Sequence, residues 1–527
     1  MANARQRSWF GWGFVDETLP PDEVEGLGSF AAATLGAGAP PTPAPTLADV
    51  VLAAPRVSAP PALAGLLSEA LLDRVGHTYG KAFRDVARAY ERRWENPPDL
   101  VAFPTSEQDV IDLLDWAGGR GVAVIPYGGG SSVVGGVEAD LRDTTDPDRP
   151  TVSLDVTRLR GVVEVDEVSR AALVRAGTYG PDADAALKPF GLSMRHYPQS
   201  YEHSTVGGWI ATRAGGHFAT GPTHIDDLVE SIRAVTPTGV WESRRLPSSG
   251  AGPSPDRALL GSEGTLGVIT QAWLRLHRRP QFRASRAVAF DDLGSAFTAA
   301  RLVAQSGLGP ANCRLLDPVE ARSAGVADGR CVLLLGFESA DHPVDAALAR
   351  ALQIVQDCAG RPQGDDGTRS DATAGWRQAF LRAPYLRDAM VGLGYVAETF
   401  ETACTWGDLP ALHDAVTRAV TSVLHEVCGG GQVGMRVTHV YADGLAPYYT
   451  VLAPGRAGSL VSMWDEVKAA ASQAILGAGG TVTHHHGVGR VHAAGYRAQR
   501  PEPFGRALRA AKSELDPDGL LNPGVLS

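Results

Sequence analysis

The 527-residue sequence contains little cysteine, very little lysine and no long apolar run. Its five cysteines include no Cys-x-x-Cys pair, so we expect free thiols in a reducing compartment rather than a disulfide or zinc framework. No apolar run approaches the roughly 18 residues that a membrane-spanning helix requires. The opening residues, MANARQRSWFGWGF, contain no apolar core of a secretory signal, so we expect a cytoplasmic protein.

Positive charge is also scarce. The net charge is -11, which argues against nucleic acid as a partner because phosphate binding needs a basic surface. Only four of the 48 basic residues are lysine, which excludes a lysine-rich membrane patch. Hydrophobic residues make up 44% of the chain and charged residues 20%, a composition typical of a globular protein with a large core.

The chain divides into four sections by its pattern of helix, strand and turn signals. Residues 1–95 form a helical and extended N-terminal segment. The three further sections are residues 96–279, 280–475 and 476–527. Helical spacing predicts helices over 63–75, 80–94, 293–305, 342–359, 409–427 and 502–515, and a further helix beginning at 105–108. Strands are predicted over 100–104, 122–125, 151–154, 172–176, 228–236, 267–276, 287–290 and 331–337. The β-α-β order of the third section predicts an α+β domain with helices on one face of a sheet.

Three glycine-rich segments lie within the second section. The first, Pro126 to Ser132 (PYGGGSS), follows a buried-type strand, and its glycines allow backbone amides to converge on an anion. It is not a GxGxxG motif and no clear helix follows it, so a tight turn is an equally good interpretation when it is taken alone. The other two segments are STVGGWIATRAGG and GSEGTLGVIT, and three such segments in one domain favour a large, flat cofactor.

Together these strings resemble the FAD-binding domain of the vanillyl-alcohol oxidase family. The resemblance implies an α+β protein, with a two-lobed FAD-binding domain at 96–279, a cap domain at 280–475 with a sheet covered by helices, and a C-terminal segment that returns to the FAD domain. Some relatives attach FAD through a histidine near the first loop, but none lies between Thr78 and His196, so we expect non-covalent FAD. By position, the cofactor contacts would be Pro126, Tyr127, Gly128, Gly129, Gly130, Ser131, Ser132, Gln199, Ser200, Ser204, Thr205, Thr212, Arg213, Ala214, Gly215, Glu263, Gly264, Thr265, Leu266, Gly267, Val268 and Ile269.

The string Thr483-His484-His485-His486-Gly487-Val488-Gly489 is the most unusual in the chain. In an extended segment His484 and His486 would share a face and His485 would point the other way. The imidazoles could form an acid–base or substrate-orienting cluster, a metal site, or a polar surface loop. No cysteine or carboxylate lies close in sequence to complete a set of metal ligands, so we expect no metal.

Each of Tyr448, Arg314 and Arg387 could act in catalysis or binding, or could have only a structural role. A single tyrosine is more often a half-buried aromatic with a satisfied hydroxyl than a base. The arginines could form surface ion pairs, or could hold a phosphate or carboxylate in a cleft. Spacing alone does not decide between these alternatives.

Longer strings resemble the alkylglycerone-phosphate synthase family of ether-lipid flavoenzymes over nearly the whole chain. They include WFGWGF, RWENPPDLVAFPTSEQDV, AETFETACTW, RVTHVY, THHHGVG and DPDGLLNPG. The resemblance implies that Tyr448 is the catalytic base, that Arg387 binds substrate, and that Arg314, His484, His485 and His486 are needed for activity. The segment QSYEHST departs from the family, which usually has aspartate first and apolar residues beside the glutamate. The residues after Tyr449 lack its aromatic run.

The implied reaction exchanges the acyl group of acyl-dihydroxyacetone phosphate for a long-chain alcohol, with the flavin as a covalent carrier and no net redox change. The alternatives are an FAD-dependent 2-hydroxyacid dehydrogenase of the lactate or glycolate type, which shares the FAD loops, and a flavin-binding scaffold without activity. The implied partners are lipid-like small molecules. A peripheral membrane contact and a homodimer are both compatible with the sequence, which decides neither.

Overall fold

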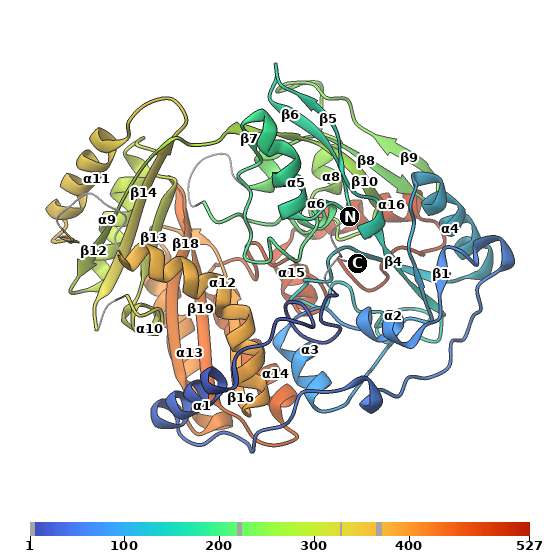
Figure 1. Ribbon diagram of the computed structural model, residues 1–527, viewed down its shortest axis with the longest axis horizontal. Helices are drawn as coiled ribbons and strands as arrows, with labels where there is room; N and C mark the ends of the chain where they lie inside the picture. Colours follow the sequence, from blue (N-terminus) through green and yellow to red (C-terminus); the bar gives the residue numbers. More distant parts are fainter. Residues whose placement is uncertain (1–5, 219–223, 327–328, 365–370, 527) are drawn as a thin grey trace.

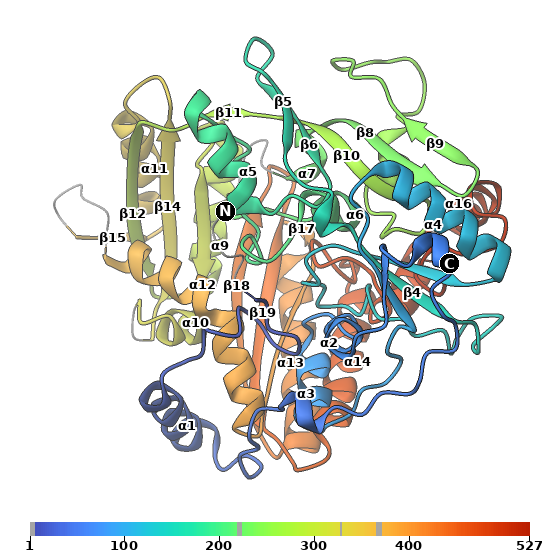
Figure 2. The same ribbon diagram turned by 45° about the vertical axis from the view of Figure 1, so that its right-hand side comes forward.

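The computed structural model describes residues 6–218, 224–326, 329–364 and 371–526. Two lobes lie side by side, one containing most of the N-terminal half and the other a large sheet with its helices (Figures 1 and 2). All five cysteines are free, as predicted. Among the described residues, no helix combines the length and the apolar character needed to cross a lipid bilayer.

The first lobe contains two main sheets. A four-stranded sheet has the order β1-β2-β4-β3, with bounds Leu67–Ser68, Leu100–Ala102, Thr151–Asp155 and Ala123–Tyr127. A five-stranded antiparallel sheet has the order β5-β6-β10-β8-β9, with bounds Val162–Asp166, Ala171–Arg175, Val268–Arg275, Val229–Thr236 and Gly239–Glu242. A two-stranded sheet joins β7 (Leu192–Ser193) to β11 (His277–Arg278).

Helices pack between and around these sheets. They are α2 (Leu71–Gly76), α4 (Glu107–Arg120), α5 (Gly180–Leu187), α6 (Val206–Thr212), α7 (Ile225–Leu228), α8 (Asp256–Leu259) and α16 (Glu502–Leu515). The helix α3 (Phe83–Tyr90) instead packs against the core of the second lobe. The predicted start of α4 is confirmed, because the Ser106 hydroxyl accepts from the Asp109 amide and the Asp109 carboxylate caps the Ser106 amide. The C-terminal tail returns to this lobe, where Leu521 pairs in parallel with Val124 of β3.

The second lobe is built on one antiparallel sheet. Its order is β15-β12-β14-β13-β18-β19-β16, with β17 paired to β19, and the bounds are Arg361–Gln363, Phe282–Phe290, Cys331–Ser339, Asn312–Leu316, Gln432–Val440, Gly444–Pro454, Tyr395–Glu401 and Cys404–Thr405. Its helices are α9 (Leu293–Gln305), α10 (Pro318–Ser323), α11 (Asp345–Asp357), α12 (Asp371–Gly392), α13 (Leu409–Cys428), α14 (Leu460–Gly477) and α15 (Ala493–Gln499). The N-terminal α1 (Pro21–Leu35) lies beside α12 (Figure 1).

One face of this sheet is covered by α9, α11, α13 and α14, which form the largest hydrophobic core. The prediction that helices cover a single face is incomplete. A smaller apolar cluster lies on the opposite face, where α10 and the Phe380 ring of α12 pack on alternate residues of β12, β13 and β14. One part of this second face is therefore covered by helices, and another part lines a cavity.

The predicted helix over 63–75 is wrong. Its sequence instead forms a 3-10 turn, the short strand β1 and the short helix α2. Leu67 pairs with Ala102 of β2, so sheet formation with a distant segment overrides the local helical spacing.

Candidate functional site

A cavity of about 420 Å³ lies between the two lobes. Its lining combines the first glycine loop and nearby hydroxyl-bearing residues of the first lobe with β16, β18 and β19 of the second. Tyr448, His485, His486, Arg314 and Arg387 all line it. The structure therefore brings together side chains that the sequence distributes over more than 170 positions, between 314 and 486.

The glycine loop provides one wall through its backbone. Among the described residues, the amides of Gly129, Gly130 and Ser131 have no protein acceptor, and all three residues face the cavity. A Cβ added at Gly129 would lie 1.9 Å from the carbonyl oxygen of His203, and Gly130 has a φ of 67°. This wall thus offers a row of N–H groups without protein acceptors, with no room for a side chain at Gly129 or Gly130, as suits a bound pyrophosphate.

The opposite wall consists of side chains placed by strand alternation. Thr399, Arg436, Thr438, Tyr448 and Thr450 point into the cavity. Neighbouring residues such as Val437, Tyr449 and Val451 point into the helix-covered core, where the ring of Tyr449 stacks on that of Phe400. In the sheet register Tyr448 lies between Arg436 of β18 and Glu401 of β16, so three functional side chains share one row.

Tyr448 is almost completely buried on this wall. Its hydroxyl donates to Thr399 Oγ1 at 2.9 Å, and the guanidinium carbon of Arg436 lies 3.9 Å from the centroid of its ring. Burial raises the pKa of Tyr448, while Arg436 and the Thr399 hydrogen bond oppose that rise. Tyr449 is instead a buried core residue, and its hydroxyl lies within hydrogen-bonding distance of His413.

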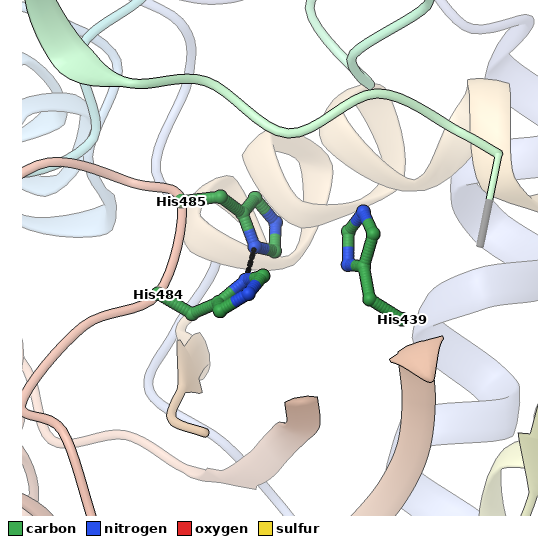
Figure 3. Close-up of side chains that lie close together, drawn as sticks. All are labelled: His439, His484 and His485. Carbon is green, nitrogen blue, oxygen red and sulfur yellow. Dashed lines mark hydrogen bonds between the residues drawn. The ribbon is translucent and has the colours of Figure 1, made fainter. Parts of the chain in front are cut away.

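The histidine triplet is not extended, so the arrangement in which His484 and His486 would share a face is not found. Residues 483–486 bend around the carboxylate of Glu401, whose Oε1 atom accepts the amides of His484, His485 and His486. His485 and His486 consequently both line the cavity, while His484 lies behind them against Tyr441. Figure 3 shows His484 and His485 in contact, with His439 from the end of β18 beside them.

The rings of His484, His486 and His439 are held in their neutral forms. Burial lowers the pKa of His484 and of His486 to about 3, with the neighbouring His485 ring adding to the effect and Glu401 opposing it. Burial also lowers the pKa of His439 well below its usual range. Neutral rings can accept or donate protons but carry no charge at physiological pH.

Two groups of three could in principle hold a metal ion, His439 with His484 and His485, and Glu401 with His485 and His486. The first group is already committed elsewhere. His439 Nε2 lies 2.9 Å from the carbonyl oxygen of Gly216, to which it must donate, and His484 Nε2 bonds to the Tyr441 hydroxyl. The donor set of this first group therefore fits a hydrogen-bonded network better than a metal centre.

Three arginines reach the cavity from different elements. Arg314 of β13 is 1% exposed, and burial together with the nearby Arg436 lowers its pKa to about 9. A surface ion pair is thereby excluded for Arg314. Arg387 of α12 pairs with its neighbour Asp388, whose other oxygen accepts the Trp12 amide from the N-terminal WFGWGF string. A cavity wall with several guanidinium groups suits an anionic ligand.

Other residues proposed from the sequence lie outside the lining. Neither Pro126, Tyr127 and His484 nor the third glycine segment from Gly264 to Ile269, of which only the last two residues belong to β10, lines the cavity. The Arg213 side chain is 55% exposed and pairs with Asp226. Glu263 is buried and accepts the amides of Val488 and Gly489, which ties the histidine segment to the first lobe.

The other residues predicted to contact the cofactor line the cavity: Gln199, Ser200, Ser204, Thr205, Thr212, Ala214 and Gly215. Gln199, at the position where the sequence departs from the family, donates its Nε2 to the carbonyl oxygen of Phe380 in α12. It thus links the first lobe to the second across the cavity.

Sequence reasoning missed Glu401, Arg436 and Thr399 as parts of the site. All three lie within the quoted strings AETFETACTW and RVTHVY, so the signal was present but had no assigned chemistry. Their importance follows from the register of β16, β18 and β19, which sets each beside Tyr448 or the triplet.

An apolar arm extends the same cavity towards α1. It is lined by Leu27, Phe30, Ala31 and Leu35 of α1, by Met390 of α12, and by Leu452 of β19. The polar end with its arginines and the apolar arm form one continuous space, which suits a ligand with an anionic head and a hydrocarbon chain.

Comparison with known proteins places the two lobes in known domain families. Residues 98–243 match an FAD binding domain, and residues 279–526 match the C-terminal domain of FAD linked oxidases. FAD is the cofactor, and the row of free amides and the absence of room for a Cβ at Gly129 fit its pyrophosphate.

The sequence is 28% identical to the alkyldihydroxyacetonephosphate synthase of Trypanosoma brucei brucei over 484 residues, covering 86% of this chain and 77% of that protein. It is 26% identical over 436 residues to the mitochondrial D-lactate dehydrogenase [cytochrome] of Arabidopsis thaliana, covering 82% and 74%.

Among solved structures, an alkyldihydroxyacetonephosphate synthase superposes with a TM-score of 0.80 at 26% identity, covering 98% of both chains. A p-cresol methylhydroxylase with substrate bound gives a TM-score of 0.70 at 14% identity, covering 96% of this chain and 97% of that one, which shows a shared fold. The chain is a flavoenzyme with the fold of the vanillyl-alcohol oxidase type, and it is similar over most of its length to the alkyldihydroxyacetonephosphate synthases.

Proposed function

We propose that this protein is an FAD-dependent alkylglycerone-phosphate synthase. It would exchange the acyl group of acyl-dihydroxyacetone phosphate for a long-chain alcohol, in the synthesis of ether lipids. The observation that carries the proposal is the continuity of the cavity, which joins an arginine-rich end at Tyr448 to an apolar arm beneath α1. A small 2-hydroxyacid would not fill that apolar arm.

Tyr448 would exchange a proton with the carbon next to the substrate ketone. In the resting cavity its hydroxyl proton is held by Thr399 Oγ1, and burial disfavours the phenolate. The Arg436 guanidinium over its ring favours the phenolate, as the expected role of a base requires. His485, whose ring centroid lies 6.1 Å from that of Tyr448 at an interplanar angle of 25°, is the neighbouring proton acceptor.

Arg387 and Arg314 would hold the substrate phosphate. A phosphate offers oxygens that match the fork of a guanidinium group, and each arginine reaches the same cavity. For Arg314, whose buried charge is disfavoured by Arg436, an anion would restore the balance. When bound without a covalent link, as we propose, FAD supplies an electron-poor ring against which the activated carbon can be held.

The substrates are lipids, so we further propose peripheral contact with a membrane surface, in the cytoplasm. A homodimer is an additional expectation. Neither is needed for the chemistry described above.

The experiment supplies the purified yellow protein with acyl-dihydroxyacetone phosphate and hexadecanol. Formation of the ether product, without bleaching of the flavin by D-lactate or glycolate, is the expected result. Rapid flavin reduction by a 2-hydroxyacid without ether product would establish the dehydrogenase instead. A flavin that responds to none of these compounds would indicate a scaffold without activity.

A further inference from the structure

Glu401 accepts four hydrogen bonds from the histidine segment but is not among the residues that line the cavity. It is the last residue of β16, and its side chain is 1% exposed. Burial alone would raise the pKa of Glu401, but His485, His486 and His484 together lower it well below its usual range. The group is therefore a carboxylate, and a buried carboxylate must be balanced by its partners.

One oxygen of Glu401 shapes the histidine segment. Oε1 accepts the Thr483 hydroxyl at 3.0 Å and the amides of His484, His485 and His486 at 3.0, 2.6 and 2.7 Å. Three successive amides that converge on one atom force the backbone into a bend. This bend turns both His485 and His486 towards the cavity, where an extended strand would have presented them on opposite sides.

The other oxygen determines the tautomer of His485. Oε2 contacts His485 Nδ1, which lies 3.0 Å from His484 Nδ1, and His484 Nε2 lies 2.9 Å from the Tyr441 oxygen (Figure 3). A carboxylate only accepts, so His485 Nδ1 carries the hydrogen, which His484 Nδ1 can share, and His484 Nε2 then donates to Tyr441. In the neutral ring this arrangement leaves Nε2 as the acceptor nitrogen, and the His485 ring lines the cavity.

We infer that Glu401 is a positioning residue for the reaction. It fixes His485 in the tautomer whose Nε2 accepts a proton, and it places that ring beside Tyr448. The inference rests on the proposed function for its substrates, but the contacts that support it are independent of which substrate enters. A carboxylate that orients an imidazole in this way acts through the imidazole and does not touch the reacting atoms.

The test is a double-mutant cycle with Glu401→Gln, His485→Ala and the two combined. Glutamine retains an oxygen for the amides, but its NH₂ group would donate to Nδ1 and reverse the tautomer. We expect Glu401→Gln to lower kcat about 100-fold or more with KM changed less than about threefold, since the loss is in orientation rather than binding. In the His485→Ala background the same change should cost less than about threefold.

Additive losses, or a Glu401→Gln enzyme with wild-type turnover, would overturn the inference. Hydrogen exchange over residues 481–489 gives a readout that does not depend on activity. The amides of His484 to His486 should remain protected in Glu401→Gln and become exposed in Glu401→Ala. A stoichiometric bound metal in elemental analysis of the wild-type protein would also overturn the tautomer assignment.

Thr483→Val provides the matched control, because it removes one bond to Oε1 and leaves Oε2 and His485 intact. Its turnover should stay within about threefold of wild type. If it loses as much activity as Glu401→Gln, the role of Glu401 is structural only. Absence of ether product from the wild type would refute the proposed function alone, since the cycle can then be run on flavin reduction by a 2-hydroxyacid.

Discussion

The two walls of the cavity bind by different means. The wall from the first lobe offers backbone amides from a loop of glycines, whereas the wall from the second offers side chains set on neighbouring strands. The first depends on the absence of side chains, as at Gly129, and the second depends on the register that sets Arg436 and Glu401 on either side of Tyr448. A backbone wall suits a cofactor that stays, and a side-chain wall suits a substrate that must be changed.

The largest expected effect comes from closing the backbone wall. Gly129→Ala would set a methyl group 1.9 Å from the His203 carbonyl oxygen, so the loop must shift and FAD should be lost. The purified variant should be colourless, with flavin absorbance near 450 nm reduced about tenfold or more, because the amide row no longer converges on the pyrophosphate. Gly119→Ala, in a helix with open space around it, is the control and should remain yellow. A yellow Gly129→Ala variant would contradict the assignment of this loop.

The side-chain wall should fail in the opposite manner, losing turnover and keeping the cofactor. Tyr448→Phe removes the hydroxyl but leaves the ring stacked near His485. We expect full flavin content and a fall in kcat of about 100-fold or more, the usual cost of losing a general base. Product formation with the acyl and alcohol substrates measures the effect. Near-wild-type turnover would reject Tyr448 as the base.

A smaller effect is expected when the charge beside Tyr448 is removed. Arg436→Met takes away the cation that favours the phenolate, and it leaves the buried Glu320 without its partner. We expect turnover to fall about tenfold and stability to fall by about 3–5 kcal/mol, as when one partner of a buried ion pair is removed. Adding Glu320→Gln should restore the melting temperature but not the turnover. Recovery of both together would mean that Arg436 acts through stability alone.

The smallest effect is a difference between the two lobes' contributions to the pH dependence of folding stability. His484 and His486 have pKa values of about 3 when folded, so the unfolded chain takes up protons below about pH 6.5 and stability falls as the pH decreases. Glu263 has its pKa raised by burial to about 7, so it contributes stability that is present at low pH and lost as the pH rises through 7. Between pH 6.5 and 4.5 the contributions of Glu263 and of the two histidines to the free energy of unfolding therefore have opposite signs.

Melting temperatures measured from pH 7.5 to 5 test this opposition. With two histidines against one glutamate, each worth about 1.4 kcal/mol per pH unit, the wild type should lose stability on acidification. Glu263→Gln should make that loss steeper by a few degrees, and His486→Gln should make it shallower. Parallel curves for all three proteins would show that these groups do not titrate as their burial implies.

Local patterns predicted much of the fold. The bounds of α9 and α16 were predicted to the residue, and the capping residues before α4 were recognised, because these features depend on neighbours within a few positions. The helix predicted over 63–75 failed where a distant strand competed for the same residues. The histidine segment is not extended for a related reason, since a carboxylate more than 80 residues away in the sequence bends it.

The sequence by itself determined the glycine loop, whose residues had to be free of Cβ atoms, and the identity of the polar groups available to a site. Only the tertiary structure decided which of these groups meet. Strand register set Arg436 and Glu401 beside Tyr448, and packing of the two lobes brought Arg314 and the histidines to the same cavity. The physical reason is range: backbone conformation is set by nearby residues, whereas convergence of side chains depends on the pairing and packing of distant segments.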